Sequence, residues 1–396
     1  METLKIILLA LACAGCAYWI LALACIILYR PETPARPASQ YPPITILKPV
    51  KGADRGFRKN LKSFCTQDYP EYEVIVGTED ADDPAIHIAR QIGAETGGMV
   101  KVVVTGELPG PNRKVSLLEK MAQTARNDLV AVSDGDMRVD ETYLKTIAAE
   151  YLEGAGMVTS LYRITGPVSA GSALESLAIA TDFIPSVMVA RVVEGGFSFG
   201  FGASMLFSRG ALDEAGGWGP VAHYLADDYQ LGKRLFDTGR SVRLSSYIMD
   251  LVPGREGVGD YLSRQLRWAR TYRTSRPKGY LGYGVTHALT YGLAYLLAAR
   301  GPLSAALFAA IFVLRYGAAF SVYGKFIRKK SWLKWLIFLP IRDIAGFFVW
   351  AASFAGNKVR WRGRVFKVGK GGIMEESASQ NFNSGISANA ANKEQE

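Results

Sequence analysis

The chain has 396 residues, 49% of them hydrophobic, and a formal net charge of +10 at pH 7. This length allows one large domain, or a domain of about 250 residues with further segments. Three of the four cysteines lie in one N-terminal apolar run, a distribution that excludes a disulfide framework and a zinc site and fits a reducing compartment. Lys and Arg concentrate beside apolar segments, which favours anionic lipid headgroups over nucleic acid as a partner.

Residues 1–30 are predicted to be a membrane anchor. Ile6–Leu28 is a run of 23 residues without a charge, long enough to cross roughly 30 Å of hydrocarbon. A secretory signal with a lipid-attachment site at Cys13–Cys16 is the competing interpretation, but the apolar run continues well past it. Basic residues follow the run, so the positive-inside rule predicts that the bulk of the protein is cytoplasmic. Residues 31–43, rich in Pro and Ala, are predicted to be a linker.

Strands and helices alternate between Ile44 and Ser160. The predicted strands cover residues 44–47, 72–77, 100–105, 129–133 and 156–160. The predicted helices lie between them: one starts near Asp54, one passes through Ile86 and Ile92, and two cover 115–125 and 142–152. This alternation predicts right-handed βαβ units and a mostly parallel sheet. Ligands of such sheets bind at the carboxyl ends of the strands.

Two acidic turns fall at predicted strand ends, Asp80–Asp83 after one strand and Asp134-Gly135-Asp136 after another. An Asp-x-Asp turn can offer carboxylate oxygens to one divalent cation. Mg²⁺ or Mn²⁺ suits such ligands, because hard cations prefer carboxylates and keep open positions for substrate phosphates. Ordinary turn chemistry explains either cluster alone, but explains both less easily.

The next part of the chain holds three further signals. Gly195–Gly202 mixes glycine with phenylalanine and is predicted to be a strand with a structural role, since it lacks the spacing of a phosphate-binding loop. Asp227 and Asp228 stand near the start of a predicted helix, as helix caps or with one of them as a general base. Residues 260–274 form a basic amphipathic helix that lies on the membrane surface or turns its arginines toward a diphosphate.

Residues 284–356 are predicted to be C-terminal membrane segments. Val285–Ala299 and Leu303–Tyr323 read as a hairpin of membrane helices, and the basic residues that follow agree with a return to the cytoplasm. Trp332–Phe354 is also apolar but carries Arg342 and Asp343 at its middle. Such charges are costly in lipid unless they are paired or face protein, so a spanning and a re-entrant segment both stay open. Residues 357–396 are predicted to be a tail, first basic and then disordered.

The ordered set of motifs resembles the ceramide glucosyltransferase family, family 21 of the glycosyltransferases, and more broadly the inverting family 2 enzymes. The resemblance runs from the anchor to about Gly372. It rests on Leu47–Gly52, Asp82–Ile86, Ala226–Tyr229 and Arg264–Trp268. It implies a GT-A-like (Rossmann-like) α/β nucleotide-sugar-binding domain over residues 44–283, including the interfacial helix, with one N-terminal transmembrane helix and C-terminal membrane helices.

The resemblance also implies roles for individual residues. The first acidic turn would bind the donor through Asp80 and Asp83. Asp134 and Asp136 would hold Mg²⁺ or Mn²⁺ and the donor diphosphate, and Asp228 would be the catalytic base. The other expected donor contacts are Lys114, Arg264, Arg267 and Trp268. Animal members lack a carboxylate matching Asp136, so the full Asp-x-Asp makes metal dependence the expectation here.

A second resemblance leaves the acceptor open. Asn112–Ser116, Phe183–Val187 and Arg267–Thr271 are similar to bacterial hopanoid-biosynthesis glycosyltransferases, which transfer an N-acetylglucosamine unit to a polyol-bearing hopanoid. The expected function is therefore transfer of a hexose, with inversion, from a UDP-sugar to a lipid hydroxyl. A ceramide glucosyltransferase is the first expectation and a hopanoid glycosyltransferase the alternative. The expected location is a bacterial inner membrane, with several membrane passes and the catalytic domain in the cytoplasm.

Two rival functions fit the sequence less well. A processive polysaccharide synthase shares the Arg-x-x-Arg-Trp motif, but would want more membrane helices than the three or four candidate segments. A non-enzymatic membrane scaffold would be expected to have lost at least one of Asp134, Asp228 and Arg267, and all three are present.

Overall fold

A seven-stranded sheet forms the centre of the α/β domain in the computed structural model, which describes residues 1–32 and 40–376. The strand order is β3-β2-β1-β4-β8-β6-β9, and the first four strands are parallel. Strand β8 is antiparallel to both neighbours. The strands are β1 (Ile44–Pro49), β2 (Tyr72–Thr78), β3 (Val100–Val104), β4 (Leu129–Val132), β6 (Met157–Thr159), β8 (Met205–Ser208) and β9 (Val242–Leu244). The predicted parallel-dominated sheet is confirmed.

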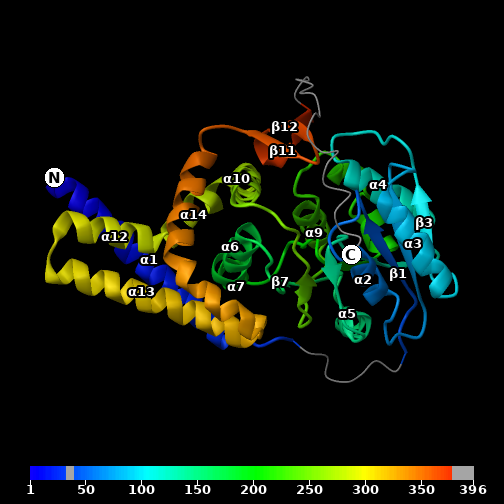
Figure 1. Cartoon of the computed structure of the whole chain (residues 1–396), viewed down its shortest axis with the longest axis horizontal. Coiled ribbons are helices and arrows are strands. Elements are labelled where there is room, and N and C mark those ends of the chain that lie inside the picture. The colour runs from blue at the N-terminus through cyan, green and yellow to red at the C-terminus, as the bar shows by residue number, and fades with distance from the viewer. Residues whose placement is uncertain (33–39, 377–396) are drawn as a thin grey trace, which may run out of the picture.

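Helices cover this sheet, and the right half of Figure 1 shows them around it. They are α2 (Phe57–Phe64), α3 (Pro84–Glu95), α4 (Arg113–Gln123), α5 (Tyr143–Leu152), α8 (Arg209–Glu214) and α9 (Asp227–Asp237). Every residue of β1 and β4 is buried, as expected of parallel strands covered on both faces. This double burial explains why the strands stand out in the sequence as short apolar runs.

Gly195–Gly202 is a loop, so the predicted strand is wrong. The loop follows α7 (Ile184–Val193), and its only β-type contact within the described part of the chain is an isolated bridge from Phe201 to Ser204. The reason is close backbone packing rather than strand pairing. A Cβ atom on Gly202 would lie 3.0 Å from the Asp134 carboxylate, and one on Gly200 would lie 3.0 Å from the Asp228 carbonyl oxygen. Only glycine allows the loop to come this close.

Two small sheets complete the strands. In the first, β10 (Met249–Leu251) lies between β5 (Met137–Arg138) and β7 (Tyr162–Ile164). The second is antiparallel and contains β11 (Lys358–Trp361), β12 (Arg364–Val368) and β13 (Met374–Glu376). The basic first part of the predicted tail forms this sheet over residues 358–376, which buries its own apolar cluster around Phe366 and Leu225. The rest of the tail (377–396) and most of the predicted linker (33–39) lie outside the described residues.

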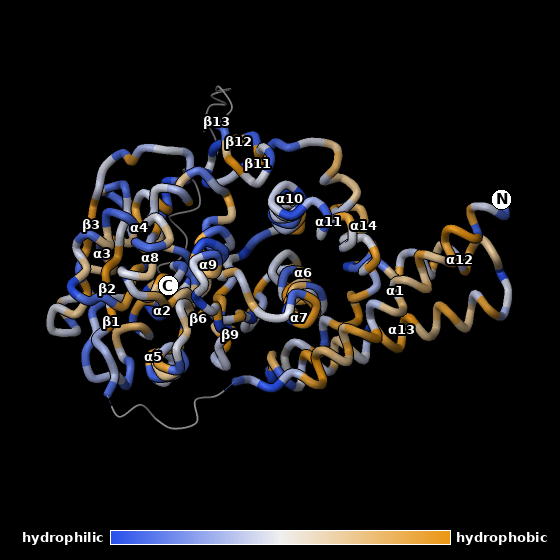
Figure 2. The backbone as a smooth tube through the Cα atoms, turned by 180° about the vertical axis from the view of Figure 1, so that it is seen from behind, coloured by the Kyte–Doolittle hydropathy of each residue, from blue (hydrophilic) through white to orange (hydrophobic). Residues whose placement is uncertain are grey.

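Within residues 1–32 and 40–376, four helical stretches are long and apolar enough to cross a membrane: Glu2–Leu28, Ala170–Val193, Pro302–Ile327 and Trp332–Ser353. Three were predicted, and the stretch 170–193 was not. It comprises α6 (Ala170–Ala178), a π-helical turn η1 (Ile179–Phe183) and α7. About half of it is buried in the protein (56%), against 22% for the N-terminal helix. In Figures 1 and 2 it lies between the α/β domain and the outer apolar helices.

The outer apolar helices pack side by side, and Figure 2 shows their hydrophobic colouring. They are α1 (Glu2–Leu28), α12 (Ala288–Ala299) and α13 (Pro302–Val322), next to α14 (Leu339–Ser353). The predicted hairpin is present as α12 and α13. Helix α12 has only 12 residues, about 18 Å at 1.5 Å per residue, which is shorter than a hydrocarbon core. The helix α10 (Val258–Ser275), followed by α11 (Pro277–Tyr283), connects this group to the α/β domain.

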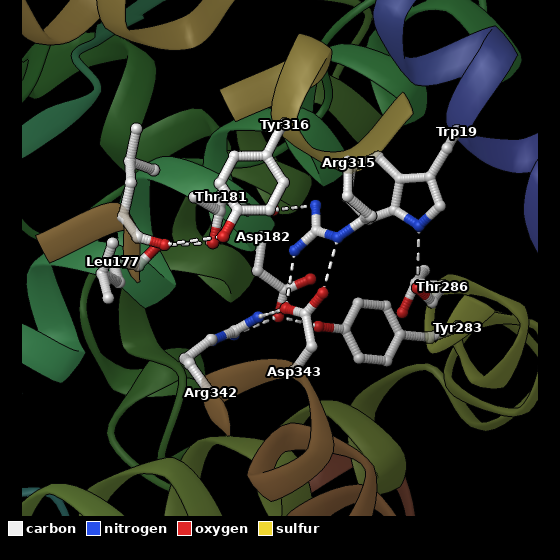
Figure 3. A network of polar contacts seen from close by, with 11 residues as sticks. Trp19, Leu177, Thr181, Asp182, Tyr283, Thr286, Arg315, Tyr316, Arg342 and Asp343 are labelled. Atoms are coloured by element: carbon white, nitrogen blue, oxygen red, sulfur yellow. Dashed lines mark hydrogen bonds and ion pairs between the residues drawn. The ribbon is translucent and has the colours of Figure 1, made fainter. Parts of the chain in front are cut away.

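The two charges in α14 are paired and buried, as the sequence required (Figure 3). Asp343 accepts two hydrogen bonds of 2.6 Å from Arg315 on α13. Arg342 lies 2.6 Å from Asp182 in η1 and 3.3 Å from Asp343. The Arg315 guanidinium also lies 3.7 Å from the ring centre of Trp19 on α1. The network therefore joins α1, η1, α13 and α14 through charges that would each be costly alone.

Candidate active site

A cavity of about 860 Å³ opens where β1 and β4 end. Its size is at the upper end of the range for small-molecule sites. The residues around one end are polar and come from five places: the loop after β1, the start of α4, the Asp134–Asp136 turn, the start of α9, and α10. They include Lys51, Asp54, Lys114, Asp134, Asp136, Asp227, Asp228, Arg264, Arg267 and Trp268. The structure thus brings together seven of the nine predicted site residues, all except Asp80 and Asp83.

The Asp134-Gly135-Asp136 turn is held by two lysines. Lys48, fully buried on β1, donates a 2.8 Å hydrogen bond to the backbone oxygen of Asp134. Lys114 lies 2.8 Å from the Asp134 carboxylate. Asp136 differs, because its buried Oδ1 has no hydrogen-bond partner among the described residues. Burial, with the Asp134 charge beside it, raises the Asp136 pKa to about 7. A cation at this turn would satisfy the orphaned oxygen.

Asp228 is held by backbone groups in the first turn of α9. Its Oδ2 accepts a 2.8 Å hydrogen bond from the Gly202 N–H, and its Oδ1 accepts one of 2.8 Å from the Tyr229 N–H. Burial, followed by the charge of Asp227, raises the Asp228 pKa to about 6, while Lys114 acts in the opposite direction. A fixed carboxylate with this pKa is suited to accept a proton near neutral pH.

Lys114 links the two carboxylate groups. Its Nζ lies 2.8 Å from Asp134 and 3.5 Å from Asp227. Burial would lower the Lys114 pKa, but the neighbouring carboxylates, Asp134 first, raise it above its ordinary value. Lys114 is therefore a permanent cation between the turn after β4 and the start of α9. Its positive charge offsets the repulsion among Asp134, Asp227 and Asp228.

Asp80 and Asp83 lie outside the cavity lining. Asp83 is the N-cap of α3, and it also accepts a 2.7 Å hydrogen bond from the Gly52 N–H in the loop after β1. Asp80 is exposed and accepts a hydrogen bond from the Asp82 N–H. Asp83 thus holds the loop after β1, and its carboxylate oxygens already accept hydrogen bonds from backbone N–H groups. The donor-binding role of both residues stays a prediction.

Arg264 and Arg267 lie one turn apart on α10 but have different surroundings. Arg264 is within 3.3 Å of the buried Glu175 and 3.2 Å of Glu256. Arg267 forms no ion pair with any carboxylate in residues 1–32 or 40–376. Burial and the charge of Arg264 lower the Arg267 pKa to about 10. Arg267 remains charged at neutral pH and is the arginine of this pair whose charge is left for an anionic ligand.

Sequence reasoning missed several residues of the site. Lys48 and Glu175 each had a signal, a charge inside an apolar segment, which marks a functional or paired group. Trp361 and Arg362 line the cavity from the turn between β11 and β12, and Lys51 donates a 3.2 Å hydrogen bond to the Arg362 carbonyl oxygen. No local sequence pattern indicates that this turn belongs to the site, because the chain returns to the cavity only after the last apolar helix.

The α/β fold with carboxylates and arginines around this cavity defines a nucleotide-sugar glycosyltransferase. The solved mannosyltransferase PcManGT from Pyrobaculum calidifontis, in complex with GDP-Man and Mn²⁺, has the same fold with a TM-score of 0.53 and 19% identity. The match covers 88% of this chain and 98% of that one. Residues 7–374 match the family model described as glycosyl transferase family 21, and the chain belongs to this family.

Two curated relatives come from Caenorhabditis elegans. Ceramide glucosyltransferase 1 is 25% identical over 399 residues, which covers 93% of this chain and 82% of the relative. Ceramide glucosyltransferase 3 is 23% identical over 353 residues, which covers 87% and 76%. The expected family, fold class and type of enzyme are thereby confirmed.

Proposed function

We propose that this enzyme transfers glucose from UDP-glucose, with inversion, to a hydroxyl group of ceramide. The observation that carries the proposal is the single cavity shared by Asp228, the Asp134–Asp136 turn and helices of membrane-spanning length. A sugar nucleotide requires a polar binding site and a lipid requires apolar helices, so transfer between them requires a cavity that both kinds of residue line. The ceramide glucosyltransferases of C. elegans support the choice of sugar and lipid.

In the proposed reaction, Asp228 removes the proton from the acceptor hydroxyl. The Gly202 and Tyr229 N–H groups fix both carboxylate oxygens of Asp228, which lines the cavity. The hydroxyl oxygen then attacks the anomeric carbon from the face opposite the leaving diphosphate, which inverts that centre. Arg267 meets the negative charge that develops on the diphosphate. Arg264 is paired with Glu175 and Glu256, so its charge is already compensated within the protein.

The residues fit a divalent cation. Asp134 and Asp136 would hold Mg²⁺ or Mn²⁺, and the unpartnered Oδ1 of Asp136 is the observation that favours this. When bound, the ion would supply positive charge to the leaving diphosphate. The mannosyltransferase of the same fold was solved with Mn²⁺.

Removal of divalent cations should therefore abolish transfer, and added Mg²⁺ or Mn²⁺ should restore it. Asp136→Asn should lower the affinity for Mn²⁺ by at least about tenfold, because it removes one anionic ligand. Mn²⁺ binding to the purified enzyme can be followed by electron paramagnetic resonance. Asp213→Asn, at an exposed position, is the control. Full activity of a metal-free enzyme in excess chelator would exclude this role.

A hopanoid glycosyltransferase that uses UDP-N-acetylglucosamine is the second candidate. The residues that resemble that group include Lys114, Phe183, Ser186 and Val187, and all four line the cavity. Product analysis separates the two: the purified enzyme is incubated with UDP-glucose or UDP-N-acetylglucosamine and with ceramide or a polyol-bearing hopanoid. Glucosylceramide is the expected product. A product formed only from the hopanoid would replace the ceramide proposal.

We further propose that the enzyme lies in a bacterial inner membrane and that its α/β domain faces the cytoplasm, where UDP-sugars are made. A single cysteine at the exposed Glu153, in a variant with the four native cysteines replaced, should be protected from a membrane-impermeant maleimide in intact cells. It should react fully once the inner membrane is permeabilised. Labelling in intact cells would place the domain on the opposite side.

A further inference from the structure

Helices line the cavity together with the carboxylate-bearing turns, and the part lined by these helices is called the limb. Its lining is mostly apolar and comes from α6, η1, α7 and α14. The residues that define this limb are Ala178, Ile179, Val187, Ala190, Gly346 and Val349. Several of them are small, which leaves width for a ligand between the helices. The lining on these four elements is thus more apolar than the lining around Asp134 and Asp228.

A row of aromatic rings links the limb to the catalytic end. Phe201 precedes Gly202, whose N–H binds Asp228. The Phe201 ring lies 5.2 Å from that of Phe183 in η1, and Phe183 lies 5.3 Å from Tyr162. All three residues line the cavity. An apolar chain that follows these rings would therefore begin next to the proposed base.

Three charged residues of these elements line the cavity: Glu175, Asp182 and Arg342. Asp182 lies in the π-helical turn η1 and lines the cavity. Its Oδ2 binds Arg342 at 2.6 Å and accepts a hydrogen bond from the Tyr283 hydroxyl (Figure 3). Its Oδ1 has no hydrogen bond to the residues that the structure describes. π-helical turns are rare and are frequent at functional sites.

We propose that this limb is the channel for the acceptor lipid and that Asp182 Oδ1 accepts a hydrogen bond from the lipid head. The inference rests on the proposed function and deepens it. The acceptor is then an amphiphile with an apolar chain that fits between α7 and α14. Its head carries a second donor, a hydroxyl or an amide N–H, beside the hydroxyl that reacts. The Arg342 and Tyr283 contacts hold the carboxylate still, so that its free oxygen is presented to the channel.

Photolabelling of the full-length enzyme with a ceramide that bears a diazirine in its acyl chain tests the channel. Cross-links are expected on residues 178–190 and 346–350. Ala190→Trp should reduce this labelling at least about tenfold by filling the channel. Val192→Trp, on the same helix but 54% exposed and outside the lining, should leave it unchanged. Both variants should bind UDP like the wild type, which shows that they are folded. Cross-links confined to the outer faces of α1 and α13, or equal labelling of the two variants, would overturn the channel.

Competition against the same probe tests Asp182. A ceramide methylated at its amide nitrogen and secondary hydroxyl keeps the reacting hydroxyl but lacks the second donor. It should compete about 10- to 100-fold less well than ceramide with the wild type, the range for a hydrogen bond to a charged acceptor. Equal competition would overturn the role of Asp182. Labelling needs no turnover, so a labelled channel without sugar transfer refutes only the proposed reaction, and transfer without a labelled channel refutes only this inference.

Discussion

Replacement of Asp228 by Asn is expected to lower the turnover number by about 10²- to 10⁴-fold, the range for loss of a general base. Asn keeps the size of the side chain, and its oxygen can still accept the Gly202 hydrogen bond. It cannot take a proton at neutral pH. Binding of the UDP-sugar should therefore change little, so the loss should appear in kcat rather than in KM. Steady-state kinetics with both substrates varied measures this.

Asp227→Asn is the matched control, since Asp227 is the adjacent carboxylate and pairs with Lys114. It should reduce kcat far less than Asp228→Asn. The pH profile gives a second check. The deprotonated form of Asp228 is active, so kcat/KM of the wild type should fall as the pH drops below about 6, the raised pKa of this group. That acid limb should vanish in Asp228→Asn. A larger effect at Asp227 would move the base by one residue.

The first half of the fold was predictable because its strands are buried on both faces. Strands such as β1 and β4 then appear as short apolar runs between turns, and their residues pair along the whole predicted length. The same logic located Asp134 and Asp136, since the ends of parallel strands meet at one edge. Hydrophobic periodicity did not predict that Asp228 lies beside the same edge of the sheet. That prediction depended on the resemblance to a family, because β8 runs antiparallel and α9 follows a long irregular stretch.

The second half was predicted less well because tertiary contacts decide its structure. The loop 195–202 has strand-like composition, but glycines let its backbone pack against Asp134 and Asp228. The helical stretch 170–193 carries the charged residues Glu175 and Asp182, so it does not appear in the sequence as one long apolar run. Their partners, Arg264 and Arg342, lie far along the chain. The β11–β12 turn reaches the cavity only through the path of the preceding helices. Such long-range pairing leaves no local signal.

Loss of the Asp343 charge is expected to destabilise the protein by about 3–5 kcal/mol, the usual result of removing one member of a buried ion pair. Asp343 is 5% exposed and binds Arg315 through two short hydrogen bonds. In Asp343→Asn, the buried Arg315 guanidinium would keep its hydrogen bond to the Thr181 carbonyl oxygen but lose its carboxylate partner. The shift in the free energy of unfolding can be measured by denaturant titration in detergent, with tryptophan fluorescence as the signal.

Two variants separate the loss of a buried pair from a general effect of charge removal. Asp68→Asn removes the exposed partner of Lys145 and should cost no more than about 1 kcal/mol. The double variant Arg315→Met/Asp343→Leu removes both charges of the buried pair and should recover much of the stability lost in Asp343→Asn, because no uncompensated charge remains. If Asp343→Asn were as stable as Asp68→Asn, the network would not hold α1, η1, α13 and α14 together. Asp182 would then lack the rigid support that its role in the lipid channel requires.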